Sequence, residues 1–375
     1  MISMHESSRP LSSEEKEIYE AHLHTLGLDS NIWDLYERFL QVSSAYSIPR
    51  IIRVMEGKDH LAHIYMIKCR DYGATLSRSG IIKSMSRLMG IPVYSWLRSG
   101  IAAENNANPG YLNTSTGDDN TMSKLIEHLK QKYFMIFILD LESNHGQYTN
   151  AVTLPYTDEG IVDTSTYQSI DDYRKQHKNL KKKFRVYRNH GGRTDIEKGR
   201  LSVEDQQHIA SCVLSTSKKS VFKLPYQDIY PAMCSSSAEI DNDRIIHFLS
   251  RSDDQFFGYH SFIQFNEQMR CLNGAFNREL KSTYHAYENM IYKVIEYAIE
   301  QKIRTIYFGP VLNETKKRMM NQFLPTRLYV YSKFPLVLKL FTPILKNSRM
   351  ANRQVLAFSG IETKKKAAYP SKQPS

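Results

Sequence analysis

Cysteine is scarce in this sequence of 375 residues. The four cysteines, Cys69, Cys212, Cys234 and Cys271, lie far apart, and no two of them have the close spacing that zinc sites use. Neither a disulfide framework nor a structural metal site is therefore expected. The simplest interpretation is a reduced, cytoplasmic chain without a metal.

Long hydrophobic runs are also missing. No stretch approaches 18 uncharged apolar residues, so no transmembrane helix is expected. The first residues, Met1–Glu6, have neither a basic start nor an apolar core, so they do not resemble a secretory signal. Hydrophobic residues make up 41% and charged residues 24% of the chain, which excludes wholesale disorder. The length suits two domains.

Acidic residues are few relative to basic ones in the second part of the chain. Residues 1–150 contain 15 Lys and Arg against 17 Asp and Glu, whereas residues 151–375 contain 35 against 22. The last 75 residues alone contain 15 against 2. This asymmetry predicts an anionic partner, which is a phosphorylated cofactor, a nucleic acid or an acidic membrane. Charge alone does not choose among the three.

The first half alternates helices and strands. Apolar residues at helical spacing, Ile32, Leu35, Phe39 and Leu40, predict that the first 45 residues are helical, with a capped start at Ser12. The next expected elements are a hairpin of Arg50–Met55 and His60–Ile67, a mobile loop over residues 101–122, a helix from Met122 to about Lys132 and a strand at Phe134–Leu141.

A second unit is predicted from about residue 165, and its clearest feature is a three-stranded antiparallel meander. The strands Arg244–Leu249, Gln255–Phe265 and Gln268–Phe276 are separated by short polar turns. A strongly amphipathic helix, Tyr284–Gln301, follows. The other expected elements are helices at Tyr167–Lys183, after Ser202, at Tyr226–Ser236 and at Asn313–Gln322, and strands at Arg193–Glu197, Thr305–Phe308 and Thr326–Tyr331, the last completing this unit. This order indicates an α+β fold.

Three stretches of the second unit carry a resemblance to a known family. They are Ile170–Tyr173 with the basic run Leu180–Arg185, then Leu272–Phe276 with the helix from Tyr284, and finally Tyr307–Pro310 with Thr315–Arg318. Together they resemble the GNAT superfamily of acyltransferases, in the branch of the Fem-type peptidoglycan aminoacyltransferases and their acyl-CoA-using relatives. The resemblance covers roughly residues 165–330.

The resemblance implies a two-lobed GNAT-like fold with a mixed, mostly antiparallel central sheet flanked by helices. Residues 1–164 would form a degenerate GNAT-like lobe, residues 165–360 the acyltransferase domain, and residues 361–375 a basic disordered tail. Acyl-CoA would act as a co-substrate, with no permanently bound cofactor. The donor phosphates would meet the start of the helix at Ser282, Thr283 and Tyr287, because a helix N-terminus favours anions.

Two basic residues, Lys316 and Arg318, are candidates for contacts with the same phosphates. The alternative interpretation is a solvated basic helix face. The helix start Lys281–Ala286 lacks the glycine-rich sequence of standard acetyltransferases, and this difference leaves the donor open.

The candidate catalytic residues are His260, Tyr284 and Glu288. His260 lies on the middle meander strand and is either a proton acceptor or a packed residue. Tyr284 could protonate a leaving thiolate or pack, and Glu288 is either a base or a partner of the helix dipole. Water carries the proton in many GNAT enzymes, so the class does not require a protein base.

The predicted function is transfer of an acyl group from a CoA thioester to a small amine or amino-acid-like acceptor, by direct attack and without a covalent enzyme intermediate. One alternative is a Fem-type transferase that uses aminoacyl-tRNA and acts on a cell-wall precursor. The other is a non-catalytic basic module that binds nucleic acid or membrane. The basic run at residues 178–188 and the apolar segment Phe334–Phe341 are the stretches on which that module would depend. The sequence does not determine the oligomeric state.

Overall fold

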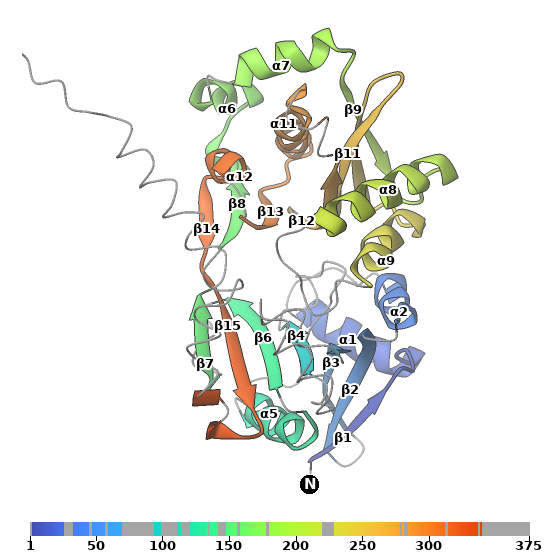
Figure 1. Cartoon of the computed structure of the whole chain (residues 1–375), viewed down its shortest axis with the longest axis vertical. Helices are drawn as coiled ribbons and strands as arrows, with labels where there is room; N and C mark the ends of the chain where they lie inside the picture. Colours follow the sequence, from blue (N-terminus) through green and yellow to red (C-terminus); the bar gives the residue numbers. More distant parts are fainter. Residues whose placement is uncertain are drawn as a thin grey trace, which may run out of the picture.

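Two β-sheets lie one above the other along the long axis of the molecule (Figure 1). The computed structural model describes residues 2–25, 33–44, 47–56, 59–69, 94–98, 111–113, 120–133, 135–141, 148–155, 158–177, 180–219, 229–277, 280, 284–311, 314–336 and 338–339. The statements below concern these residues. The predicted tail at 361–375 and most of the predicted loop at 101–122 lie outside them.

The first sheet has the strand order β1-β2-β3-β4-β6-β15-β7, and β5 pairs with β3. The predicted hairpin and the predicted strand before residue 141 are confirmed as β2–β3 and β6. The strands are β1 (Ile2–Ser7), β2 (Ser47–Glu56), β3 (Asp59–Cys69), β4 (Tyr94–Arg98), β5 (Tyr111–Asn113), β6 (Met135–Leu141), β7 (Val152–Pro155) and β15 (Thr326–Ser332).

Three helices, α1 (Ser13–Thr25), α2 (Trp33–Gln41) and α5 (Asn120–Lys132), accompany this sheet. The predicted cap at Ser12 is confirmed, because its hydroxyl accepts from the N–H of Glu15 at 3.2 Å and the Glu15 carboxylate accepts from the N–H of Ser12 at 2.7 Å. The prediction of helix throughout residues 1–45 is wrong at its start. Residues 2–7 form β1 because they pair antiparallel with β2, and local sequence does not reveal this distant pairing.

The second sheet has the order β14-β8-β13-β12-β11-β10-β9. The meander is confirmed as β10–β12, and the strands predicted at 193–197 and 305–308 are confirmed as β9 and β13. The strands are β8 (Glu159–Asp163), β9 (Arg193–Lys198), β10 (Ile245–Arg251), β11 (Phe256–Phe265), β12 (Gln268–Phe276), β13 (Thr305–Pro310) and β14 (Gln322–Leu324).

The helices of this part are α6 (Ile170–Gln176), α7 (Leu180–Asn189), α8 (Val203–Lys219), α9 (Tyr230–Ser235), α11 (Ala286–Glu300) and α12 (Glu314–Met319), with 3₁₀ turns η3 (Thr164–Thr166) and η4 (Ser236–Glu239). The predicted single helix Tyr167–Lys183 is wrong. The N–H of His177 bonds to the carbonyl of Arg174, and this tightened last turn ends α6.

Helices cover both faces of the second sheet (Figure 1). Helix α11 packs on the face that carries Phe248 and Phe262, whereas α8 and α9 pack on the face that carries Leu249 and Tyr259. The alternation of buried side chains to two faces is why β10 and β11 are apolar at nearly every position. The α+β, mostly antiparallel fold class is confirmed. No helix among the described residues has the length and apolar character needed to cross a membrane.

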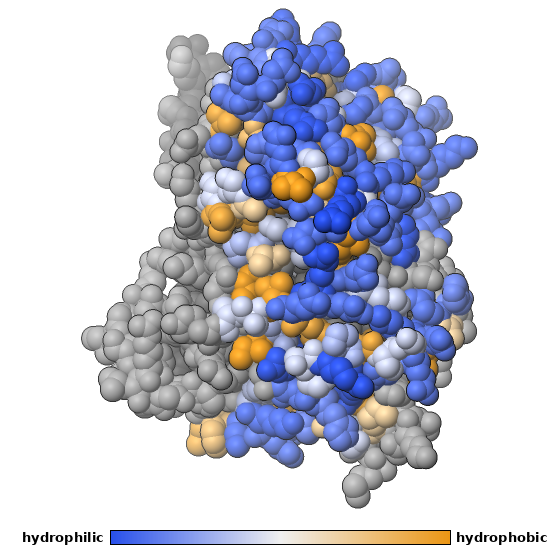
Figure 2. All heavy atoms as spheres, turned by 90° about the vertical axis from the view of Figure 1, so that its right-hand side faces the viewer, coloured by the Kyte–Doolittle hydropathy of each residue, from blue (hydrophilic) through white to orange (hydrophobic). Residues whose placement is uncertain are grey.

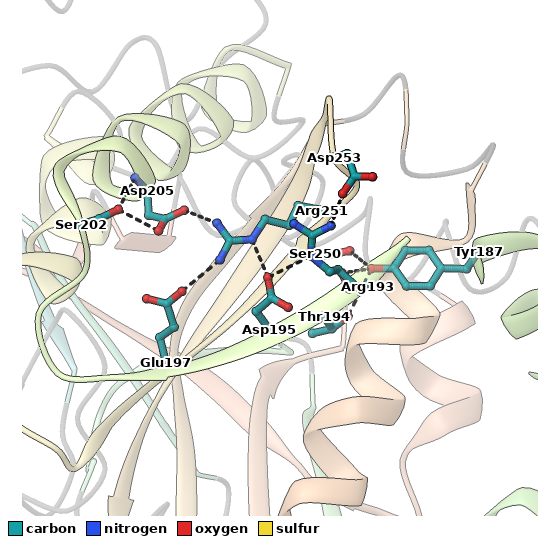
Figure 3. A network of polar contacts seen from close by, with 10 residues as sticks. All are labelled: Tyr187, Arg193, Thr194, Asp195, Glu197, Ser202, Asp205, Ser250, Arg251 and Asp253. Carbon is teal, nitrogen blue, oxygen red and sulfur yellow. Dashed lines mark hydrogen bonds and ion pairs between the residues drawn. The ribbon is translucent and has the colours of Figure 1, made fainter. Parts of the chain in front are cut away.

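The surface shown in Figure 2, which is the right-hand side of Figure 1, is mainly hydrophilic with separate apolar spots. A polar network joins β9, β10 and α8 (Figure 3). The guanidinium of Arg251 donates to Asp195 at 2.6 Å, to Asp205 at 2.8 Å and to Glu197 at 3.0 Å. The Ser202 hydroxyl in turn caps α8, because it accepts from the N–H of Asp205 at 3.1 Å and donates to the Asp205 carboxylate at 2.8 Å.

The two sheets exchange a strand. In both, four antiparallel strands are followed by a parallel pair, β4 with β6 or β12 with β13, and then by two more antiparallel strands. Strand β15 pairs with β6 and β7 in the first sheet, although it follows the second sheet in sequence. The prediction that Thr326–Tyr331 completes the second unit is therefore wrong, because β8 occupies that position next to β13. The domain boundary at 164/165 stays a prediction.

Candidate active site

The parallel pair of the second sheet separates after three positions. Strands β12 and β13 are in register at Gln268–Thr305, Met269–Ile306 and Arg270–Tyr307, and no later pair joins them. Strand β13 then bends toward β8, with a register shift between Tyr307 and Pro310. Gly309 lies in this bend with φ +73° and open space beside it. The backbone of β12 beyond Arg270 is therefore not paired with β13.

A β-bulge shifts the register of β12 in the same region. Ser261 pairs with Asn273 and Phe262 with Cys271, so Leu272 is the extra residue. Beyond the bulge, Gly274 is exposed and lies opposite His260. A Cβ atom at Gly274 would be 2.0 Å from Cδ2 of His260, which means that the imidazole occupies the space over this glycine.

His260 belongs to an aromatic cluster below the start of α11. Its ring centroid is 5.4 Å from that of Phe276 and 5.8 Å from that of Tyr287. His260 is 6% exposed, and Tyr287 is equally buried. Of the predicted site residues, these two are thus brought together, one from the middle strand and one from the helix.

Tyr284 lies just before α11 and packs differently. Its ring stacks on Phe257 at 5.1 Å and meets the edge of His190 at 4.9 Å. The next residue, His285, has φ 54°, a left-handed backbone that begins the helix. The predicted donor contacts Ser282 and Thr283 lie outside the described residues, so they stay predictions.

Glu288 is buried in an ion pair. Its carboxylate accepts from Nζ of Lys183 in α7 at 2.6 Å, and Nδ1 of His285 is 3.8 Å away. Asn289 donates from Nδ2 to the carbonyl of His285 at 2.9 Å. These contacts hold α7 beside the first turn of α11, and they occupy the carboxylate that the sequence suggested as a base.

Lys316 reaches the end of β13 from α12. Its Nζ donates to the carbonyls of Phe308 at 2.5 Å, Gly309 at 3.1 Å and Pro310 at 2.8 Å. Burial lowers the pKa of Lys316 to about 8, although the nearby Cys271 and Glu159 raise it. Lys316 thus holds the bend of β13, whereas Arg318 on the same helix is exposed.

Two polar residues of β12, Arg270 and Asn273, were not identified from the sequence. Both precede Gly274 and lie where β12 leaves β13. The sequence pattern of this strand could have identified them, because these polar residues interrupt an otherwise apolar run. Within the described part of the chain, no group of three His, Cys, Asp or Glu side chains has the arrangement of a metal site.

Comparisons with known proteins agree with this architecture. Residues 174–317 match the family model of the acetyltransferase (GNAT) domain. L-PGS from Bacillus licheniformis is similar in structure, with a TM-score of 0.51 and 11% identity over 88% of this chain and 96% of that chain. The C-terminal domain of a putative lysylphosphatidylglycerol synthetase from Agrobacterium fabrum is similar with a TM-score of 0.53 and 8% identity, at the same coverage.

The crystal structure of FemX is also similar, with a TM-score of 0.48 and 10% identity over 90% of this chain and 100% of that chain. No curated protein matches in sequence. The matched domain spans the separating strands β12 and β13 and the helix α11 between them. The chain therefore contains an acyltransferase domain of the GNAT superfamily.

Proposed function

We propose that this protein transfers an acyl group from a CoA thioester to an amine by direct attack. The proposal depends on one observation: the pairing of β12 with β13 stops at Arg270 and Tyr307, before either strand ends. Helix α11 begins at the same end of β12, since only residues 277–285 connect them. An extended donor arm lying between the strands would therefore have its phosphates near a helix N-terminus.

The chemistry requires little covalent help from the protein. The amine nitrogen attacks the thioester carbonyl, a C–N bond forms, and the C–S bond breaks with release of CoA as a thiolate that takes up a proton. The developing oxyanion needs a donor, and the backbone N–H groups of β12 beyond Arg270 that face β13 can supply it. The separation of the strands thus serves both to align the donor and to stabilise the transition state.

His260 is the proposed proton acceptor for the attacking ammonium. The imidazole lies over the exposed Gly274, where β12 is free of β13. Tyr284 is the proposed proton donor to the leaving thiolate, since its ring lies at the start of α11. Glu288 contributes by holding Lys183 and α7 in place.

On the donor side, Tyr287 would pack against the pantetheine arm, and Ser282, Thr283 and Arg318 would contact phosphates. Lys316 would act through the bend of β13, because its ammonium group already binds three carbonyls there.

A second candidate donor is aminoacyl-tRNA. The observation that favours it is the exposed basic face of α7, with Lys181, Lys182, Arg185 and Arg188, next to the start of α11. These cations would suit the phosphates of a nucleic acid. Salt-dependent retention on tRNA, together with transfer from charged tRNA, would select this donor over CoA.

The first test is calorimetry with CoA and mass spectrometry of products formed from mixed acyl-CoA donors and an amine library. We expect heat on CoA binding and a product heavier by one acyl group. Absence of both heat and a melting shift at millimolar CoA would overturn the CoA proposal.

The role of His260 is tested by His260→Asn. Because a general base contributes about 10²–10⁴-fold, we expect a corresponding fall in kcat with KM for CoA nearly unchanged. The acidic limb of the pH profile should disappear. His5→Asn on the exposed side of β1 is the control, and an unaltered pH profile in His260→Asn would exclude this base.

A further inference from the structure

Arg270 lies at the last paired position of β12 and β13. Its guanidinium carbon is 3.6 Å from the ring centroid of Tyr307, the residue in register with it across the ladder. This cation–π contact holds the guanidinium over the ring while Arg270 remains only half-buried. The cation is thus held rigidly at the point where the two strands separate.

Arg270 has no carboxylate partner among the described residues. Its contact in the sheet is a long hydrogen bond from Nη2 to Oε1 of Gln268 at 3.4 Å, and Nε is buried without an acceptor. Other arginines in this part of the protein, such as Arg251, are surrounded by carboxylates. A buried donor without a partner is costly, and an acceptor supplied by a ligand would remove this cost.

Asn273 has an acceptor atom that lacks a donor. The Ser237 hydroxyl donates to the carbonyl of Cys234 at 3.1 Å, so its oxygen accepts from Nδ2 of Asn273 at 3.1 Å. Because the Ser237 oxygen needs a donor at this position, the amide atom that faces it is Nδ2, and the other amide atom is Oδ1. Asn273 is only 4% exposed, and its Oδ1 atom is buried without a hydrogen-bond donor among the described residues.

The two side chains lie on the same face of the sheet. Arg270 is in register with Ile263 and Asn273 with Ser261, two positions apart on β11, so their cross-strand partners are separated by about 7 Å. One residue offers an unpaired donor on a cation and the other an unpaired acceptor. A ligand that satisfies both carries an oxyanion and a hydrogen-bond donor, such as an N–H group, a short distance apart.

We propose that Arg270 and Asn273 bind an α-amino acid, with the carboxylate on Arg270 and the amine on Oδ1 of Asn273. A simple carboxylate would satisfy Arg270 but would give Asn273 no donor. A simple amine would do the reverse. This inference rests on the proposed function, of which it specifies the acceptor. Arg270 and Asn273 lie on the face of the sheet opposite α11 and His260, so the acceptor would meet the thioester in the space between β12 and β13, and its proton would reach His260 past Gly274, which has no side chain.

The test is thermal stabilisation and calorimetry of the full chain with matched probes. The probes are the twenty standard amino acids, their decarboxylated amines, their deaminated acids and inorganic phosphate. We expect at least one amino acid to bind more tightly than both of its halves and more tightly than phosphate. Arg270→Gln should weaken that binding by about tenfold to a hundredfold, because it removes a hydrogen bond to a charged group.

Arg244→Gln is the matched control, because Arg244 is also stacked on an aromatic ring, Phe265 at 5.4 Å, but lies away from the separating strands. It should leave amino-acid binding unchanged. Arg270→Lys, which keeps the charge and loses the planar fork, should bind with intermediate affinity and would show that the site survives substitution. Asn273→Leu should reduce the preference for an amino acid over its deaminated acid.

The inference is overturned if no amino acid binds better than its halves, or if Arg270→Gln binds as the unaltered protein does. Tighter binding of phosphate than of any amino acid would also overturn it. CoA binding and product formation are measured on the same samples. If CoA binds but no amino acid binds better than its halves, the amino-acid site is excluded and the proposed function stands. If an amino acid binds but CoA does not, the proposed CoA-dependent function is excluded and the amino-acid site stands.

Discussion

At the scale of single residues, Lys316 shows how a predicted ligand contact is used inside the protein. The sequence presents it within the run Lys316-Lys317-Arg318, which resembles a solvated phosphate-binding face. Only the first of the three is buried, and its ammonium group binds the carbonyls that end β13. Charge in a sequence does not reveal which members of a basic run point inward.

Lys316→Met should destabilise the protein because it leaves the three carbonyls of the β13 bend without their donor. The expected loss is about 1–3 kcal/mol of unfolding free energy, the usual cost of an unsatisfied buried polar group. Urea denaturation measures it. Lys317→Met, on the exposed neighbour, is the matched control, and equal stability of the two variants would contradict this role.

His247 is a second residue whose role depends on burial. It is 0% exposed, with Nδ1 2.8 Å from the Ser261 hydroxyl and Nε2 3.0 Å from the carbonyl of Gly199. Burial lowers the pKa of His247 to about 4, although the Gly199 carbonyl and Asp205 raise it. The imidazole is therefore neutral in the folded protein at neutral pH.

Stability should fall as the pH drops from about 6.5 toward about 4, because the unfolded chain takes up a proton that the folded chain does not. The loss of unfolding free energy caused by His247 is at most about 3 kcal/mol, and it is complete below the pKa that His247 has in the folded protein. Urea denaturation at pH 7.5, 6 and 5 measures the slope. His247→Gln should flatten it relative to His5→Gln, and an unchanged slope would exclude His247 as the cause.

At the scale of elements, Arg251 connects β9, β10 and α8 (Figure 3). Asp205, the buried member of the network, is both the partner of Arg251 and the residue bonded to the α8 cap Ser202. The sequence predicted the helix after Ser202 and the two strands separately. It did not predict that one guanidinium joins them, because two of the carboxylates come from β9 and the third from α8, and local sequence does not show that these elements meet at Arg251.

Arg251→Met should cost about 2–4 kcal/mol of unfolding free energy, because it leaves the buried Asp205 without its cation. Arg193→Met is the matched control. Its partner Asp253 has a side chain 88% exposed, so that loss should be below about 1 kcal/mol. Thermal and urea denaturation measure the stability lost in each variant. Similar losses would show that the Arg251 network stabilises the protein no more than the exposed Arg193–Asp253 pair does.

The element boundaries illustrate what local sequence can predict. The meander and α11 are confirmed, because period-two and period-3.6 apolar patterns are strong there. Strand β1 was missed, and one predicted helix is two, α6 and α7. The first outcome depends on the pairing of β1 with the distant strand β2, and the second on the tightened turn in which the N–H of His177 bonds to the carbonyl of Arg174.

At the scale of the whole molecule, the exchanged strands β8 and β15 connect the two sheets. In each sheet, the strand next to one edge, β15 or β8, comes from the part of the chain that in sequence belongs to the other sheet. The ion pair between Arg38 of α2 and Glu239 of η4 adds a side-chain contact between them. We therefore expect the two lobes to unfold together rather than in separate steps.

This cooperativity is testable because both tryptophans, Trp33 and Trp96, lie in the first lobe. Ile306→Ala in β13 of the second sheet removes fully buried volume, at a cost of about 2–4 kcal/mol. We expect the fluorescence transition of the first lobe to move to lower temperature together with the transition in circular dichroism.

Ile18→Ala, at a partly exposed position of α1, is the control and should leave both transitions in place. A fluorescence transition that does not move in Ile306→Ala would show that the lobes unfold independently. That result would also favour the predicted division at residues 164/165.

The sequence by itself determined the α+β class, the meander, the long amphipathic helix and the strand that ends in Gly309-Pro310. These depend on local periodicity and on residues with restricted or special backbone angles. Only the tertiary structure decided that β12 and β13 separate after Arg270, that β15 returns to the first sheet, and that Glu288 and Lys316 are already bound to other groups of the chain. The physical reason is that strand pairing and the burial of charge depend on which distant segments meet, and no local pattern records that.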